Sequence, residues 1–149
     1  QRKNFLLKQK IAVCDIVESA ERMKVDASDL GMQNVCLRDI IGHLENYEEI
    51  KTILFMGGNS KNGPEYFFRK SIKAHHIKLR TVSDQVPRIY SFELPKTKRT
   101  IETVSLTAPS GAANRAVGSL DAYKYQKSLN VAYNTLDFRV DQYRQFFIS

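Results

Sequence analysis

The residues best suited to contact another molecule lie in a loop of small side chains from Thr107 to Arg115. The β-branched, apolar stretch before it, Thr100 to Leu106, predicts a buried strand, so the loop begins at the edge of a sheet. Small residues let a backbone approach a ligand closely, and Pro109 lowers the entropy lost when the loop becomes ordered. Ligands of open α/β sheets bind where strands end. We therefore expect this loop to be a binding surface for another molecule.

A second candidate is the glycine-containing turn from Gly57 to Ser60, between a predicted strand and a predicted helix. The N-terminus of a helix at this place would bind an anion through its unpaired N–H groups. The glycines also have a purely structural interpretation, because a tight turn favours a residue that tolerates positive φ. The spacing matches neither the P-loop nor the dinucleotide-binding glycine pattern, and both interpretations stay open.

Asp15 is a third candidate, because it interrupts an apolar run, Ile11 to Val17, that is typical of a strand covered on both faces. A carboxylate there either bonds to a neighbouring loop or lies at the edge of a substrate pocket. His75 and His76 are poor metal co-ligands, since adjacent side chains diverge on a strand and on a helix. No third ligand lies near them in sequence, so we predict no metal site.

Positive charge is concentrated between Arg69 and Arg99, where nine basic residues stand against two acidic ones. The whole chain of 149 residues has a formal net charge of +7, which moderately favours a polyanionic partner. One interpretation of the basic stretch is a solvated face. The other is contact with nucleic-acid phosphates, which would make binding dependent on salt.

The elements that must position these residues alternate along the chain. Predicted strands are Ile11–Val17, Lys51–Met56, Ile77–Val82, Arg88–Leu94 and Thr100–Leu106. Predicted helices are Asn4–Lys10, Val35–Asn46, Pro64–Ala74, Leu120–Leu129 and Thr135–Phe147, and Glu18–Asn34 is expected to be a long loop. Residues expected to face inward are Phe67, Phe68 and Ile72, with Leu136, Val140, Tyr143 and Phe147 in the last helix. This order predicts one three-layer α/β/α domain over residues 1–149, with a short, mainly parallel sheet.

The cysteines and the hydropathy indicate the cellular setting. Cys14 and Cys36 lie within apolar segments without metal-like spacing, which predicts buried free thiols and a reducing, cytoplasmic environment. No apolar run approaches the roughly 20 residues of a membrane-spanning helix, so we expect no membrane partner.

In combination, four segments resemble the uracil-DNA glycosylase superfamily, in particular bacterial relatives akin to the hypoxanthine-DNA glycosylases. Ile11–Asp15 looks like the family's strand that ends with an aspartate, and Asp26–Asp29 resembles the loop with serine and aspartate that follows. Lys51–Gly58 is similar to the central strand and its glycine turn. Ala108–Arg115 resembles the loop, rich in proline and serine, that enters the DNA minor groove. The resemblance extends from about Phe5 to Phe147.

The resemblance implies a DNA glycosylase that flips a deaminated base, uracil or hypoxanthine, out of double-stranded DNA and hydrolyses its N-glycosidic bond. It implies base excision repair by a monomer without a metal or an organic cofactor. The implied DNA contacts are Ser105, Thr107, Pro109, Ser110, Gly111, Asn114 and Arg115, and the implied base-pocket residues are Asp15 and Gly57. It assigns no catalytic residue, because the family's water-activating segment precedes Ile11, and we expect this chain to lack that strand and its loop.

Two other functions stay open on the sequence. One is a nucleic-acid-binding relative that keeps the fold and the loop but does not catalyse the reaction. The other is a small-molecule α/β enzyme that holds a phosphate at the turn beginning with Gly57.

Overall fold

The computed structural model describes residues 1–23 and 31–147. They form two compact units. We call Asp15–Leu106 the sheet unit, and Gln1–Cys14 together with Thr107–Ser149 the helical unit, and describe each by itself. The segment Asp26–Asp29, which contributed to the family resemblance, lies outside the described residues.

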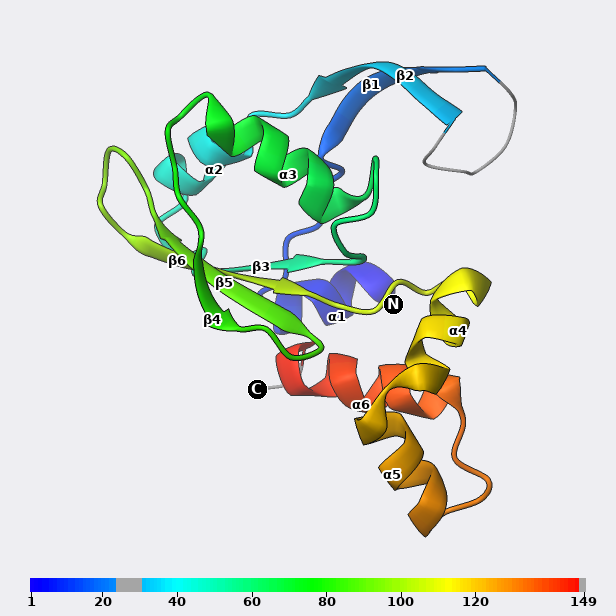
Figure 1. Cartoon of the computed structure of the whole chain (residues 1–149). Helices are drawn as coiled ribbons and strands as arrows, with labels where there is room; N and C mark the ends of the chain where they lie inside the picture. Colours follow the sequence, from blue (N-terminus) through cyan, green and yellow to red (C-terminus); the bar gives the residue numbers. More distant parts are fainter. Residues whose placement is uncertain (24–30, 148–149) are drawn as a thin grey trace. The chain divides into compact units, whose positions relative to one another are not determined.

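The sheet unit is built on four strands in the order β3-β6-β5-β4 (Figure 1). Their bounds are β3 Thr52–Phe55, β4 Arg80–Ser83, β5 Arg88–Glu93 and β6 Thr100–Ser105. Among these strands β3 and β6 run parallel, whereas β5 is antiparallel to both of its neighbours. The α/β class is therefore confirmed, but a mainly parallel sheet is wrong for the described strands. The physical reason is that short turns join β4, β5 and β6, and a parallel pair needs a long crossover.

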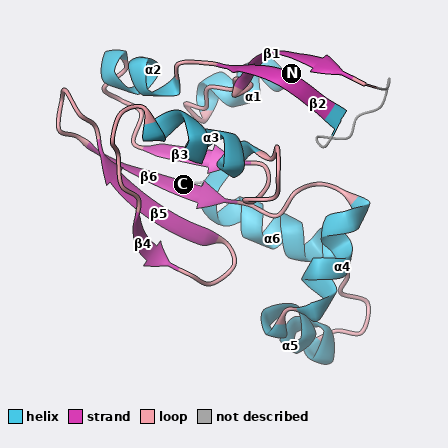
Figure 2. Cartoon of the chain, turned by 45° about the horizontal axis from the view of Figure 1, so that its top comes forward, coloured by secondary structure: helices cyan, strands magenta, loops and turns pink. Residues whose placement is uncertain are grey.

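Two helices, α2 (Ile40–Asn46) and α3 (Pro64–Lys73), cover one face of this sheet (Figures 1 and 2). The core between these helices and the sheet contains Ile41, Leu44, Phe55, Phe68, Ile72, Phe92, Leu94 and Ile101. The predicted burial of Phe67, Phe68 and Ile72 is confirmed. Asp39 caps α2 by accepting a hydrogen bond from the Gly42 N–H at 2.9 Å, and Pro64 occupies the first turn of α3.

The N-terminal part of the sheet unit is a separate antiparallel hairpin of β1 (Val17–Arg22) and β2 (Met32–Leu37). The predicted strand Ile11–Val17, the loop Glu18–Asn34 and the helix start at Val35 are therefore wrong. An apolar run forms a buried strand only if other elements cover it, and Val13 is 75% exposed. The hairpin itself is largely exposed, so no hydrophobic alternation marks it in the sequence.

Both cysteines are exposed, which makes the prediction of buried thiols wrong. Cys14 belongs to the same uncovered stretch as Val13, and Cys36 lies in the exposed hairpin. The Cys36 Sγ atom is 3.9 Å from the Glu18 carboxylate across the two strands.

The helical unit contains α1 (Arg2–Lys8), α4 (Gly111–Ser119), α5 (Asp121–Leu129) and α6 (Thr135–Phe147). The predicted helices α5 and α6 are confirmed, whereas α4 was not expected. Tyr123 of α5 packs edge-on against Phe138 of α6, with ring centroids 6.2 Å apart. No helix in the described ranges has the length and apolar character needed to cross a bilayer.

The predicted inward stripe of α6 is wrong for Leu136 and Val140, whereas Tyr143 and Phe147 are half-buried. Leu136 is 59% exposed and Val140 is 41% exposed, whereas Gln142 is only 4% exposed. A polar side chain thus takes a buried position of this helix. Gln142 is buried because its Oε1 atom accepts a hydrogen bond from the Thr107 N–H.

Candidate functional site

The loop Thr107–Ser110, which we call the Pro109 loop, is held by side chains of α6. The Thr107 N–H donates to the Gln142 Oε1 atom at 2.8 Å, and the Thr107 carbonyl accepts from the Tyr143 hydroxyl. An Arg139 N–H donates to the Ala108 carbonyl at 3.4 Å. Buried backbone groups need partners, and here they come from a helix rather than from the loop itself. The loop backbone is therefore positioned before any ligand binds.

Ser110 ends the Pro109 loop and begins α4. Its Oγ atom accepts from the Ala113 N–H at 3.3 Å, so Ser110 is the N-cap of the helix. The cap uses a lone pair of the hydroxyl and leaves its proton able to donate to an oxygen of a bound molecule. Ser110 can therefore cap the helix and contact a phosphate at the same time.

The predicted DNA-contacting residues of the helical unit differ in exposure. Pro109, Ser110, Gly111 and Arg115 are exposed, and Thr107 is half-buried. Asn114 is also half-buried, and within residues 1–23 and 31–147 its buried Oδ1 atom has no hydrogen-bond partner. The exposed members combine a stiff residue, a hydroxyl and a guanidinium within one loop and one helix turn. Such a surface offers donors to an anionic oxygen.

Tyr143 is the other α6 residue that fixes the loop. Burial raises the pKa of its phenol, while the positive charge of Arg139 acts in the opposite direction. The protonated hydroxyl is the form that donates to the Thr107 carbonyl. The raised pKa therefore keeps this donor intact.

The other three predicted site residues, Asp15, Gly57 and Ser105, belong to the sheet unit. Gly57 is buried just after β3, and Ser105 ends β6 opposite Phe55 in the parallel pair. Gly57 and Ser105 thus lie at the C-terminal ends of two adjacent parallel strands. Asp15 is exposed before β1, where its backbone carbonyl accepts from the Arg38 side chain at 2.9 Å.

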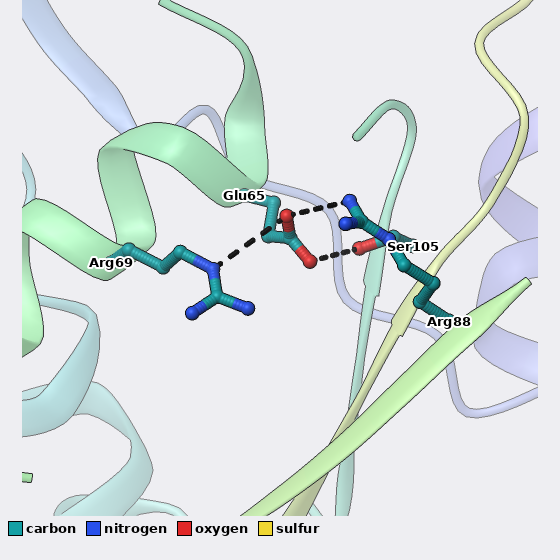
Figure 3. Close-up of polar contacts among 4 residues, drawn as sticks. All are labelled: Glu65, Arg69, Arg88 and Ser105. Atoms are coloured by element: carbon teal, nitrogen blue, oxygen red, sulfur yellow. Dashed lines mark hydrogen bonds and ion pairs between the residues drawn. The ribbon is translucent and has the colours of Figure 1, made fainter. Parts of the chain in front are cut away.

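Ser105 is 8% exposed, and its hydroxyl donates to Glu65 Oε1 at 3.0 Å (Figure 3). The other oxygen of Glu65 accepts from Arg88 at 3.0 Å and lies 3.7 Å from Arg69 Nε. One carboxylate, itself 1% exposed, therefore links α3, β5 and β6. In this unit Ser105 connects neighbouring elements, and its hydroxyl proton is already donated to Glu65.

The sequence reasoning missed Glu65, although a signal was present. Glu65 lies three residues before Phe68 and seven before Ile72, which places it on the buried stripe of α3. An acid on such a stripe requires a partner of opposite charge. Its arginine partner Arg88 is 23 residues away, so pairing could not be deduced from local spacing.

The glycine turn does not have the geometry expected from the sequence. Among the described residues no glycine has positive φ. The helix α3 is capped by Gly63 rather than by Gly57 or Gly58. The first turn of α3 also carries the Glu65 carboxylate, which opposes the binding of a phosphate there.

The described part of the chain contains no group of three or more histidine, cysteine, aspartate or glutamate side chains placed to hold a metal ion. No family model matches the chain, and neither a curated protein nor a solved structure does.

Proposed function

We propose that this chain is a cytoplasmic DNA glycosylase of the uracil-DNA glycosylase superfamily. It would bind double-stranded DNA as a monomer and remove a deaminated base, uracil or hypoxanthine, by hydrolysis of the N-glycosidic bond. The proposal includes the three-layer α/β/α arrangement of that superfamily. The observation that carries it is the Pro109 loop, whose backbone α6 fixes while Ser110 and Arg115 stay exposed.

The physical argument starts from the cost of extruding a base. Unstacking and unpairing cost a few kcal/mol, and contacts to the flanking phosphates must offset that cost. A loop that is already ordered loses little entropy on binding. Hydroxyl and guanidinium donors of Ser110 and Arg115 fit phosphate oxygens, and Gly111 lets the backbone approach closely.

The proposal assigns no catalytic residue to this chain. The resemblance places the water-activating group on a strand before Ile11. Asp15 and Gly57 stay proposed base-pocket residues. Asp15 is exposed, and Gly57 lies at the end of β3. The phosphate-binding enzyme is the weaker alternative, because the Glu65 carboxylate occupies the start of α3.

The test is binding and cleavage of duplexes that carry uracil, hypoxanthine or no lesion, with the full chain. We expect Arg115→Ala to weaken binding and to reduce the slope of log K against log salt by about 1, as the removal of one phosphate-neutralising charge predicts. The matched control is Arg144→Ala, which removes an exposed arginine of α6. It should leave that slope unchanged.

Two results separate the alternatives. Abasic product from the lesion-containing strand supports the glycosylase. Salt-sensitive binding without abasic product from either lesion favours the nucleic-acid-binding relative that does not catalyse the reaction. Binding that responds neither to salt nor to Arg115→Ala contradicts both.

A further inference from the structure

The fold divides the basic stretch Arg69–Arg99 into residues with different roles. Arg88 pairs with Glu65, as described above. Arg99 donates to the backbone carbonyls of Glu48 and Ile50 at 2.8 and 3.0 Å, beyond the end of α2. These two arginines hold the sheet unit together, so they do not account for the positive surface.

Four other basic residues of this stretch gather at one groove of about 540 Å³ in the sheet unit. They are Arg69, Lys70, Lys73 and Lys78, and Tyr66 and Asn59 complete the polar lining. The apolar lining is Ile72, which is buried, with Ile77 and Leu79, which are half-buried. No acidic side chain is among the described residues that line it. The groove is therefore a concave, positively charged surface.

Two of the groove cations are held against aromatic rings. The Arg69 guanidinium lies 4.7 Å from the centre of the Tyr90 ring, and the Lys70 ammonium lies 5.4 Å from that of Tyr66. Cation–π contacts restrict the side chains without neutralising their charge. Arg69 Nε also lies 3.7 Å from the buried Glu65 carboxylate, which Arg88 shares, so one negative charge faces two guanidinium groups. The groove thus presents partly ordered positive charges.

We propose that this groove binds the phosphodiester backbone of nucleic acid, as a phosphate-binding surface additional to the Pro109 loop. Arg69 and Lys73 lie one turn apart, about 6 Å along the α3 axis. Phosphates follow one another at about 3.4 Å of rise per strand, so cations about 6 Å apart lie opposite phosphates roughly two steps apart. Tyr66 adds an aromatic surface on which an unpaired base or a sugar packs. An acidic protein segment lacks the bases that stack on such a ring.

The inference is independent of the glycosylase proposal, because it concerns DNA without a lesion and a different surface. The test measures binding of undamaged single-stranded and duplex oligonucleotides by fluorescence anisotropy across a salt series. The groove variant is Lys70→Gln with Lys73→Gln, since both side chains are exposed and neither makes the buried contacts of α3. The control is Lys96→Gln with Lys98→Gln, which removes the same charge from the exposed turn before β6.

We expect the groove variant to weaken binding about tenfold at low salt and to reduce the salt slope by about 2, one for each phosphate that is no longer neutralised. The control should show neither change. An equal weakening in both variants would mean that only net charge matters, which overturns the proposal. An unchanged affinity of a folded groove variant, checked by circular dichroism, overturns it as well.

A polyglutamate peptide distinguishes the other class of partner. If the groove variant loses polyglutamate binding while keeping its affinity for DNA, the groove is a protein-binding surface and the proposal is wrong. The Arg115→Ala variant tests the glycosylase proposal separately. Whether or not that proposal fails, the groove experiment keeps its meaning, because these oligonucleotides contain no lesion.

Discussion

The Glu65 carboxylate is a buried charge of the sheet unit. It is 1% exposed and contacts Ser105, Arg88 and Arg69 from three elements. A buried charge is tolerated only when paired and hydrogen-bonded. Removing one partner of the Glu65–Arg88 pair is therefore expected to cost more stability than the intact pair contributes.

Replacing this charge while keeping its shape gives the first stability prediction. Glu65→Gln leaves Arg88 without its anionic partner and should lower the free energy of unfolding by about 1–3 kcal/mol. The effect is limited because the Arg88 side chain is 36% exposed and water can solvate it. Urea denaturation measures the change, with exposed Glu49→Gln as the control. Equal stability of the two variants would contradict the role given to Glu65.

Tyr133 gives a prediction in alkaline solution. Burial and the hydrogen bond that its hydroxyl donates to Asp141, 2.8 Å long, raise the pKa of Tyr133 to about 12. The folded chain keeps this proton more tightly than the unfolded chain, whose tyrosine has a pKa near 10. The contribution to stability is therefore complete below pH 10 and is lost as the pH rises toward 12.

Asp141→Asn should lower the pKa of Tyr133 while leaving it above 10, since burial is the larger cause of the shift. The absorbance of phenolate during a pH titration measures it, and Tyr133→Phe identifies which part of the signal belongs to this residue. A pKa that does not move would show that the hydrogen bond to Asp141 has no part in the shift.

Sequence reasoning at the residue scale succeeded for residues that meet solvent. Pro109, Ser110 and Arg115 are exposed in or next to a loop after the last strand, as the small, polar composition indicates. It failed for Ser105 and Gln142, which are buried by contacts 40 and 35 residues away in sequence. Such partners leave no local pattern.

Among the elements, the connection between β3 and α3 depends on close backbone packing at Gly63. A Cβ atom there would lie 2.8 Å from the Gly58 carbonyl oxygen and 3.0 Å from that of Ser60. Gly63→Ala should therefore destabilise the sheet unit by about 1–3 kcal/mol. In contrast, Gly118 in α4 has open space around that position.

Gly118→Ala is the matched comparison for thermal or urea unfolding. Alanine in an exposed helix position is expected to stabilise by about 0.5–1 kcal/mol, because glycine loses more backbone freedom on folding. The two variants should thus shift stability in opposite directions. A neutral Gly63→Ala would mean that the turn relaxes without cost.

The elements themselves were predicted well where an apolar face is covered. The strands β3, β5 and β6 and the helix α3 have such faces and lie where the periodicity places them, and α5 and α6 were predicted as helices although neither described helix has a buried apolar stripe. The hairpin β1–β2 was missed because its strands are exposed, and α4 was missed because its small residues resemble loop composition. Serine is a favoured N-cap residue, so Ser110 carried a signal for the start of α4 that the surrounding composition obscured.

On the scale of the whole molecule, charge supports the nucleic-acid proposals better than any single motif does. Of the basic residues behind the net charge of +7, Arg88 and Arg99 have structural partners within the sheet unit. Other positive charges remain at the groove on α3 and at Arg115. Both surfaces are tested by salt dependence, which separates phosphate contacts from other forms of recognition.

The edge strand β4 has a consequence for behaviour at high concentration. It has four residues, its pairing with β5 is irregular between Thr81 and Ser83, and it begins with the exposed Arg80. A strand that is short, kinked and charged is a poor template for a strand from another copy. This side of the sheet is thereby protected from edge-to-edge aggregation and from the strand exchange that leads to fibres.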